Sequence, residues 1–171
     1  LVEAAGGDPL RLAGLAGAGV VAAMRRLALL PGAREGLVIC DGAGALVLRK
    51  PVEGFVIPRA GAACALWPLF AALARPGSPL RVAGEMPGPV PRRFDLRACA
   101  EMRHPGGFGG PELRLAGMLI LPVPAAAAQG ALALGSGCRV CPREACPARR
   151  EPSVMSEFAL AAQQARGGIG F

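Results

Sequence analysis

Three cysteines lie close together near the C-terminal end of the sequence, at Cys138, Cys141 and Cys146. The residues around them are mainly Arg, Pro and Glu, so this segment has little apolar surface to bury and packing does not explain three thiols. Two residues between the first pair allow both sulfurs of a turn to face one point, and the next four residues bring the third sulfur round to it. Because converging thiolates bind soft or clustered metals, the spacing predicts a zinc ion or an iron–sulfur cluster.

Proline follows two of these cysteines, at Pro142 and Pro147. Each proline interrupts regular structure and removes a backbone donor, and a Cys-Pro step also occurs in the bacterial ferredoxin motif. The sequence has no second C-x2-C pair and a single histidine, His104, which argues against zinc. We therefore expect an iron–sulfur cluster of the 4Fe-4S type and keep a structural zinc ion as the alternative.

Both metals need a fourth ligand from outside the cysteine-rich segment. Cys40 ends an apolar run and Cys99 lies in a strand-like segment, where a buried free thiol is the usual state. Cys64 instead lies in a Gly/Ala-rich loop just ahead of a helical segment, whose positive N-terminal end favours a thiolate. The predicted metal ligands are Cys64, Cys138, Cys141 and Cys146.

The composition is strongly basic. The 171 residues are enough for one domain with a full core, and 19 Lys and Arg against 12 Asp and Glu give a net charge of +7. All of the basic residues except Lys50 are arginine, whose planar guanidinium suits the binding of phosphate or carboxylate. Codon bias in a GC-rich genome, which also enriches Ala, Gly and Pro, is the alternative explanation.

Neither a signal peptide nor a membrane span is evident. The best candidate span, Leu115–Leu134, contains Pro122 and Pro124 and lacks the necessary length. Six cysteines without a secretory signal favour reduced thiols and metal binding over disulfides, so we expect a cytoplasmic protein. Because Leu1 is not a methionine, we expect the chain to be part of a longer one.

No catalytic constellation is evident either. The sequence contains no Gly-x-Ser-x-Gly motif and no Walker loop, and His104 lies in a Gly/Pro loop with no carboxylate partner beyond Glu101. We therefore do not expect an enzyme.

The N-terminal residues are predicted to be helical. Asp8 before Pro9 is a typical helix start, because the carboxylate can cap the first turn and proline is tolerated at the first helical position. A second helix is expected from about Val20 to Leu29. The two helices resemble a helix-turn-helix, but only Arg25 and Arg26 are basic at the far end, which favours packing or dimerisation over DNA reading.

The centre of the sequence is predicted to be rich in strands. Gly36–Lys50 forms a hairpin around the turn residues Asp41–Gly44, and Gly54–Pro58 adds a third strand. Further strands are expected at Leu80–Met86, Arg92–Met102 and Leu113–Val123, and a helix is expected at Leu69–Ala74. These elements indicate an α+β fold: an antiparallel sheet of about five strands with an N-terminal helix pair and a C-terminal cysteine-rich metal loop.

At this point two segments resemble a known family. These are Cys138–Pro152, with its cysteine spacing followed by Arg149, Arg150 and Pro152, and the Gly-x-x-Cys-x-Leu-Trp element of Gly61–Trp67 within Arg59–Trp67. Both are similar to the C-terminal domain of bacterial transcriptional regulators that respond to short-chain fatty acyl-CoA. Arg26-Leu27 and Gly32 fit as well, and the similarity covers most of residues 10–153.

The resemblance implies a role in transcription regulation through an effector domain that carries an iron–sulfur cluster and an acyl-CoA pocket. It also implies an N-terminal DNA-binding domain that this chain lacks, and we expect a homo-oligomer. A coenzyme A pocket would explain the arginines, since its phosphates need charged donors and its acyl end needs an apolar slot. The candidate pocket residues are Arg59 and Trp67. For Trp67 the alternative is core packing, and for Arg59 a solvated surface position.

One departure from the family concerns the metal ligands, because relatives often have Gly-Cys where this chain has Gly110-Pro111. The expected parts of the chain are a helix-turn-helix-like element at 1–31, an α+β ligand-sensing core at 32–134, the cluster loop at 135–152 and a tail at 153–171. We expect a connector at Pro122–Gly130 and a short helix near Ser156–Arg166. The alternative functions are a structural zinc-binding interaction module without a small-molecule ligand and an electron-transfer protein.

Overall fold

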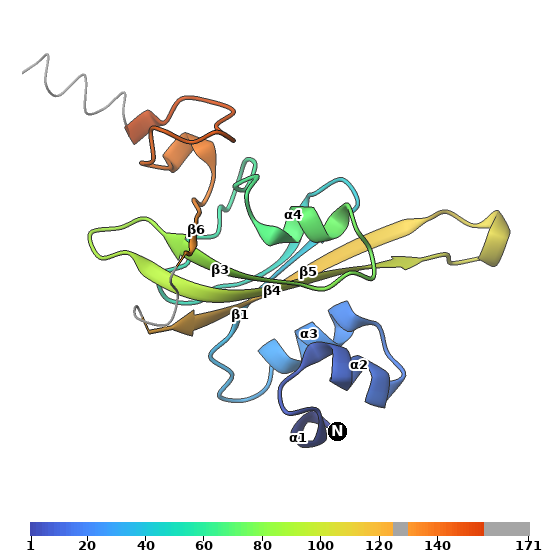
Figure 1. Ribbon diagram of the computed structural model, residues 1–171. Coiled ribbons are helices and arrows are strands. Elements are labelled where there is room, and N and C mark those ends of the chain that lie inside the picture. Colours follow the sequence, from blue (N-terminus) through green and yellow to red (C-terminus); the bar gives the residue numbers. More distant parts are fainter. Residues whose placement is uncertain (125–129, 156–171) are drawn as a thin grey trace, which may run out of the picture.

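The computed structural model describes residues 1–124 and 130–155. Six strands form one sheet in the order β2-β1-β5-β4-β3-β6. Neighbouring strands run antiparallel except for β3 and β6, which run parallel. Three N-terminal helices cover one face of the sheet, and α4 and the cysteine-rich segment lie on the other side (Figure 1). The fold is therefore mixed α+β.

The strands are β1 (Gly36–Asp41), β2 (Leu46–Lys50), β3 (Leu80–Met86), β4 (Arg92–Arg103), β5 (Leu113–Val123) and β6 (Leu132–Ala133). The helices are α1 (Val2–Ala5), α2 (Pro9–Ala16), α3 (Val20–Ala28) and α4 (Pro68–Leu73), with short 3-10 turns η1 (Gly107–Gly109) and η3 (Cys138–Val140). Within the described ranges, no helix is long and apolar enough to span a bilayer.

The predicted helix start is confirmed at α2. The Asp8 Oδ1 accepts hydrogen bonds from the amides of Leu10, at 2.8 Å, and Arg11, at 3.0 Å, and Pro9 occupies the first helical turn. The helix ends at Gly17, whose φ of 58° is a left-handed conformation that favours glycine. The predicted second helix is confirmed as α3, and α1 adds a short third helix that the sequence prediction did not include.

The sheet separates two apolar cores. In β1, Leu37 and Ile39 point toward the N-terminal helices, whereas Val38 and Cys40 point toward α4, so both faces of this strand are buried. On the helical side, Met24 of α3 packs close to β5. A Cβ atom at Gly117 would lie only 2.8 Å from the Met24 Sδ, so glycine lets the helix approach the sheet.

The expected third strand at Gly54–Pro58 is wrong. Phe55 makes one isolated bridge with Val52 and then enters the core beside α4, and the positive φ of Gly54, 80°, turns the chain out of an extended path. The sheet nevertheless has six strands rather than about five, because β6, only two residues long, was not expected. Part of the expected connector (125–129) and the expected tail helix (156–166) lie outside the described residues.

Candidate functional site

The structure brings the four predicted metal ligands to one place. Cys64, from the loop before α4, lines a cavity of about 20 Å³ together with Cys138, Cys141 and Cys146. Cys64 and Cys141 are buried, and the other two are half-buried. Neither at this cavity nor elsewhere in the described residues are three or more His, Cys, Asp or Glu side chains arranged to hold a metal ion. The thiols thus share a cavity without converging on one point.

Two hydrogen bonds join the loop that carries Cys64 to the cysteine-rich segment. The Cys64 amide donates to the carbonyl of Ser136 at 2.8 Å, and the Trp67 indole Nε1 donates to the carbonyl of Gly135 at 2.8 Å. Trp67 is itself fixed in the core, where its ring lies 5.2 Å from that of Phe55. The indole therefore holds the entry to the cysteine-rich segment against the core.

Glycines allow the two cysteine-bearing segments to come this close. A Cβ atom at Gly135 would lie 2.7 Å from the Cys141 Sγ, and one at Gly137 would lie 2.5 Å from the carbonyl oxygen of Ala62. A larger residue at Gly137 would push the two segments apart, and one at Gly135 would displace the Cys141 side chain, so both glycines are needed for the cavity as it stands.

Arg149 organises the backbone of the cysteine-rich segment. Its guanidinium donates to the carbonyls of Cys138 and Cys141, each at 3.3 Å, and to the carbonyl of Arg143. The Nε–H of Arg149 is buried and has no hydrogen-bond partner among the described residues. Because Arg149 also lines the cavity of the four thiols, this buried donor is available to an acceptor placed there.

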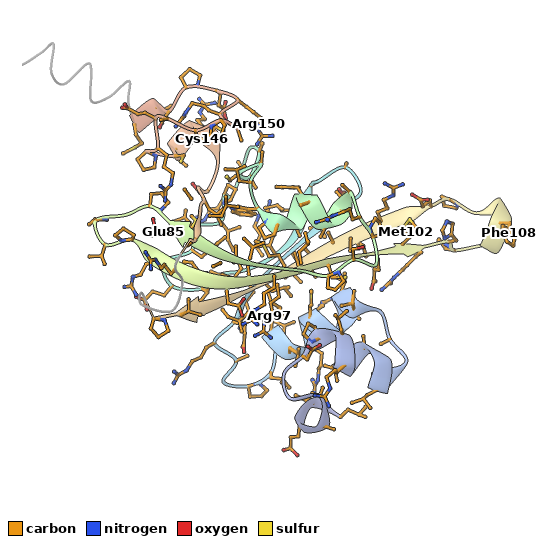
Figure 2. The ribbon with its side chains drawn as sticks, in the orientation of Figure 1. Glu85, Arg97, Met102, Phe108, Cys146 and Arg150 are labelled. Atoms are coloured by element: carbon orange, nitrogen blue, oxygen red, sulfur yellow. The ribbon has the colours of Figure 1, made fainter. Side chains whose placement is uncertain are left out.

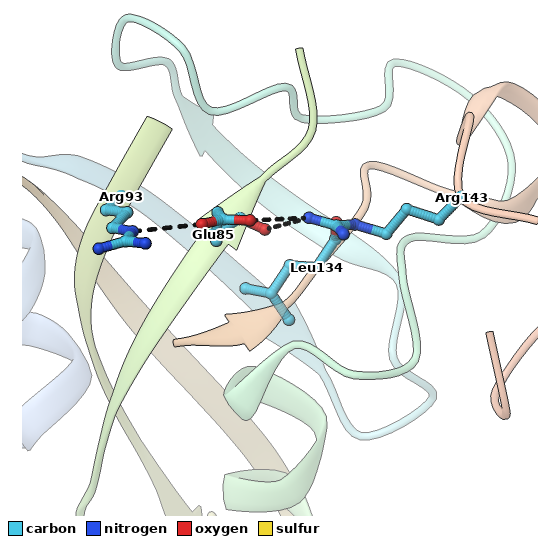
Figure 3. A network of polar contacts seen from close by, with 4 residues as sticks. All are labelled: Glu85, Arg93, Leu134 and Arg143. Carbon is cyan, nitrogen blue, oxygen red and sulfur yellow. Dashed lines mark hydrogen bonds and ion pairs between the residues drawn. The ribbon is translucent and has the colours of Figure 1, made fainter. Parts of the chain in front are cut away.

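Arg143 anchors the same segment to the edge of the sheet (Figure 3). It donates to the carbonyl of Leu134 at 3.0 Å and to that of Glu85 at 3.2 Å, and it pairs with the Glu85 carboxylate at 3.5 Å. The other oxygen of that carboxylate accepts from Arg93 at 3.2 Å. The cysteine-rich segment is thus fixed to β3 as well as to the loop of Cys64.

Arg150 contacts both cysteine-bearing segments. Its backbone amide donates to the Cys138 Sγ at 3.4 Å, and its guanidinium donates to the carbonyl of Ala63 at 2.6 Å. The amide is the main cause that lowers the pKa of Cys138 below its ordinary value, against burial, which raises it, and the nearby guanidinium adds to the lowering. The environment of Cys138 therefore favours the thiolate, the form that binds metals.

The remaining cysteines lie in the sheet. Cys40 of β1 is buried in the core beneath α4, and Cys99 of β4 is buried against the N-terminal helices. Burial raises the pKa of Cys40 to about 11 and raises the pKa of Cys99 as well. Both side chains are free thiols in environments that disfavour the thiolate.

The residues around the cavity fit a metal centre. Four sulfur donors, a lowered pKa at Cys138 and an unpaired buried donor on Arg149 suit a negatively charged, sulfur-ligated group. The cavity of about 20 Å³ has room for one water-sized occupant, but the four thiols would have to move closer together to coordinate a single metal ion. A cluster is larger, and its binding requires the segment with Cys138, Cys141 and Cys146 to move outward.

A second, larger cavity adjoins the first. It has a volume of about 430 Å³ and lies between the β1–β2 turn, the loop at 61–65 and α4. Its apolar wall includes Leu46, Phe70 and Leu73, and two arginines, Arg49 and Arg150, supply its charge. Apolar walls with a few charged groups are typical of small-molecule sites, and this volume lies in their usual range.

The two predicted pocket residues lie in different environments. Arg59 is exposed on the loop that leads into this cavity, and the preceding carbonyl, of Pro58, accepts a hydrogen bond from Arg49 at 3.1 Å. Trp67 is 1% exposed in the core and does not line the cavity. Sequence reasoning missed Arg49 and the contacts of Arg150. No sequence pattern around Arg49 identifies it as a pocket residue, because only the fold brings it into the same cavity as Arg150.

Two further cavities lie on the helical side of the sheet, with volumes of about 550 and 510 Å³. The second is lined by Arg11, Arg81 and Arg97, but Arg81 and Arg97 both pair with Asp95, at 2.9 and 3.1 Å. Burial alone would raise the pKa of Asp95, yet the hydrogen bonds from the two arginines lower it overall. Arg81 and Arg97 therefore already have a carboxylate partner. The guanidiniums of Arg49 and Arg150 instead donate to backbone carbonyls, which leaves their charge for an anion in the cavity beside the thiols. Figure 2 shows Arg97 on the helical side and both Arg150 and Cys146 in the C-terminal segment, on the other side of the sheet.

Comparison with known proteins finds relatives among transcriptional regulators. Relatives include the HTH-type transcriptional regulator RamB of Mycobacterium tuberculosis, 35% identical over 127 residues, which are 67% of this chain and 27% of RamB. They also include the propionyl-CoA carboxylase regulator of Cereibacter sphaeroides, 33% identical over 162 residues, which are 86% of this chain and 35% of the relative. The chain therefore spans about a quarter to a third of the length of these curated relatives.

A solved structure shares the fold. It is a Mycobacterium tuberculosis transcriptional regulator, with a TM-score of 0.70 at 24% identity, and the match covers 86% of this chain and 49% of that one. The family model described as "Short-chain fatty acyl coenzyme A regulator, C-terminal" matches residues 35–168, which include all four cavity cysteines and Arg150. The chain belongs to this family of short-chain fatty acyl coenzyme A regulators, of which it carries the C-terminal domain.

Proposed function

We propose that this chain is the ligand-sensing domain of a transcriptional regulator, which binds a short-chain acyl-CoA and carries an iron–sulfur cluster. The observation that carries the proposal is the adjacency of two cavities. One is lined by the four thiols and the other by apolar side chains and two arginines, and Arg149 and Arg150 follow one another at the boundary. The family and the name of the propionyl-CoA carboxylase regulator support this reading.

The larger cavity suits the two ends of an acyl-CoA. Leu46, Phe70 and Leu73 offer apolar surface to a short acyl chain. Arg49 and Arg150 line the same cavity, and Arg59 lies exposed on the adjoining loop, so guanidinium groups are available for the phosphates. Trp67 contributes from the core, by holding Gly135, which lines the cavity of the four thiols.

The smaller cavity supplies the thiols for the metal. Cys64, Cys138, Cys141 and Cys146 would hold the cluster, which when bound supplies a cross-link between the two cysteine-bearing segments and a redox-active group. The unpaired Nε–H of Arg149 would donate to a sulfur there, and the Arg150 amide donates to the Cys138 Sγ and lowers the pKa of this thiol. These contacts give two of the arginines in the cysteine-rich segment, Arg149 and Arg150, a role at the cavity.

Signalling requires that acyl-CoA bind two arrangements of the domain with different affinities. An acyl-CoA that binds one arrangement of the domain more tightly than another shifts the balance between the two. In a regulator with an upstream DNA-binding domain, that shift would change operator affinity. DNA and a second copy of the chain are therefore the proposed macromolecular partners.

Titration calorimetry of the metal-loaded protein with propionyl-CoA, free coenzyme A and propionate tests the proposal. We expect propionyl-CoA to bind, with affinity that falls as salt rises, because phosphate–arginine contacts at a cavity mouth are screened. Arg49→Ala and Arg59→Ala should each weaken binding by about 10- to 100-fold if each residue makes a charge-assisted bond to phosphate.

Arg26→Ala is the matched control, because Arg26 is an exposed arginine of α3 on the opposite side of the sheet. It should bind propionyl-CoA as the unaltered chain does. If none of the three compounds binds the metal-loaded protein, the sensor proposal is wrong.

The second candidate is a structural zinc module that binds no small molecule. The small volume of the thiol cavity, about 20 Å³, favours this candidate because a single ion needs less space than a cluster. Elemental analysis after anaerobic purification separates the two: iron with acid-labile sulfide supports the cluster, and one zinc per chain supports the module.

A further inference from the structure

The sheet extends beyond its covering helices as a two-stranded arm. β1 pairs with β5 only as far as Leu115, and β3 pairs with β4 only as far as Ala98, so the ends of β4 and β5 pair only with each other. This arm, residues 102–114, projects away from α3 and α4, and Figure 2 shows Phe108 at its far end. A two-stranded hairpin by itself is only marginally stable in water, and its large apolar side chains, Met102, Phe108 and Leu113, are exposed. The arm therefore adds little to the stability of the fold.

The loop at the end of the arm presents Phe108 outward. The Gly107 amide donates to the carbonyl of His104 at 3.0 Å, and the Gly110 amide donates to the carbonyl of Gly107 at 3.1 Å, which closes the turn η1. Gly106 enters this turn with a φ of 91°, a left-handed conformation that favours glycine. The backbone of the tip is thus ordered in advance, and an ordered segment loses less freedom when it docks.

The charges of the arm are paired locally. The Arg103 Nε lies 2.9 Å from the Glu101 carboxylate, and the Arg114 Nε lies 2.5 Å from that of Glu112. Each guanidinium already has a carboxylate partner, so the arm offers little attraction to the phosphates of a nucleic acid. An exposed apolar tip with neutralised charges behind it instead favours a protein partner that has an apolar cavity.

The helical layer contains a cavity that suits an aromatic ring. Its volume is about 550 Å³, and its lining includes four alanines of α2, α3 and the turn between them, Ala16, Ala18, Ala22 and Ala23. An apolar cavity of about 150 Å³ can hold benzene, so this one has room for a phenyl ring and part of the tip. Arg26 also lines it, and a guanidinium is attracted to the face of an aromatic ring.

The tip does not fill the cavity of its own chain. Phe108 is fully exposed, and the arm extends along the sheet, away from the helices (Figure 1). Every chain therefore carries one unoccupied tip and one cavity, and a second copy supplies the missing half of each contact. Two chains that exchange tips form a closed pair with two identical contacts, the commonest arrangement of homodimers.

We propose that the arm is a self-association site, in which Phe108 of one copy docks in the cavity of α1–α3 of a second copy. This inference rests on the proposed function only for the second copy as a partner, and it requires neither metal nor acyl-CoA. The contact lies at the small end of protein interfaces, so we expect association that is reversible and depends on concentration.

Sedimentation velocity of the 171-residue chain, at concentrations on the order of 1–500 µM, tests the role of the tip. Phe108→Ser should weaken association by at least about tenfold, the effect expected of an aromatic residue at the centre of an interface. Val90→Ser is the matched control, because Val90 is an exposed apolar residue in the loop at the opposite end of β4. It should associate as the unaltered chain does, and neither change should alter the melting temperature.

Ala22→Arg tests the other half of the contact. Ala22 is exposed on α3 and arginine is a good helix former, so the variant should fold while its long side chain occupies the cavity. Alone, Ala22→Arg and Phe108→Ser should each remain monomeric at concentrations where the unaltered chain pairs. A mixture of the two should form a weaker pair, because the intact tip of one fits the intact cavity of the other.

A photo-crosslink locates the tip directly. With p-benzoylphenylalanine in place of Phe108 and a mixture of isotope-labelled and unlabelled chains, mass spectrometry should find the tip of one chain joined to α2 or α3 of the other. If the chain is monomeric throughout, if Phe108→Ser pairs as tightly as the unaltered chain, or if the crosslinks join the two arms instead, the inference is wrong. None of these results uses acyl-CoA, so the sensor proposal is decided separately, by calorimetry.

Discussion

Four thiols share the small cavity, and three of them are held in different ways. Cys64 is fixed by its own backbone bond to Ser136, and Cys138 receives the amide of Arg150. Cys141 packs against Gly135, at a distance that a side chain there would not allow. Their spacing in the sequence could be read directly, because three of them are close neighbours. The contacts of Gly137 with Ala62 and of Arg150 with Ala63 could not, since they join residues far apart in the chain.

Replacing cysteines by serine distinguishes the ligand set. Each of four changes should lower metal affinity by more than about 100-fold: Cys64→Ser, Cys138→Ser, Cys141→Ser and Cys146→Ser. Losing a metal ligand weakens metal binding more than losing a residue that hydrogen-bonds to a ligand. Elemental analysis after purification under nitrogen measures this.

Cys40→Ser and Cys99→Ser are the controls, because both thiols are buried in the sheet away from the cavity. They should keep full metal content. Full metal retention in Cys64→Ser would show that another residue completes the ligand set.

Local signals in the sequence were sufficient to predict most helices and strands, and they failed where tertiary contacts determine the structure. Asp8 and Pro9 mark the start of α2 correctly, because capping is a contact between near neighbours. The run at Gly54–Pro58 has strand-like composition, yet Phe55 is drawn into the core. β6 exists because Leu134, fully buried, closes the core beside Gly84, where a Cβ atom would lie 2.6 Å from the Leu134 Cδ1. No local pattern reveals that contact.

At the junction of α4 and the cysteine-rich segment, Trp67→Phe tests the role of the indole. The change leaves the buried carbonyl of Gly135 without its donor, which should lower the free energy of unfolding by roughly 1–3 kcal/mol. Urea unfolding followed by far-ultraviolet circular dichroism measures it. Metal release should also accelerate, because Gly135 begins the segment that carries three of the thiols.

Phe55→Leu is the comparison for this variant. It removes packing beneath the same ring but leaves the Trp67–Gly135 bond, so it should lower stability without changing the rate of metal release. Equal effects of both variants on metal release would rule out a specific role for the indole bond.

Across the whole molecule, the sheet separates two cores with different tasks. The N-terminal helices cover one face with Met24 and Leu27, and the other face carries α4 and both candidate cavities (Figure 1). The family model begins at residue 35, so it covers the sheet and the cysteine-rich segment but not these helices. The helical layer therefore contributes stability on a face that the proposed metal and acyl-CoA sites do not use.

Met24→Ala tests this division. Met24 is 1% exposed, so its truncation should cost about 2–5 kcal/mol of unfolding free energy through the cavity that it leaves. Metal content and propionyl-CoA affinity at 15 °C should not change, because Met24 lies across the sheet from both cavities.

The double variant with Trp67→Phe should show additive losses of stability, to within about 0.5 kcal/mol, as expected for separate sites. A loss of propionyl-CoA affinity in folded Met24→Ala would mean that the two faces of the sheet are energetically linked.

The division of the thiols between two distant segments has a consequence for the order of folding. Trp67 and Gly135, which join the two segments, are 68 positions apart, and β3, β4 and β5 lie between them. Closing a loop of this length is entropically costly, so it follows the pairing of the intervening strands. Cys138, Cys141 and Cys146 are neighbours from the start and could capture a metal on an unfinished chain, whereas Cys64 reaches them only when the sheet is complete. If the four thiols hold one metal, its coordination by all four shows that the chain has finished folding.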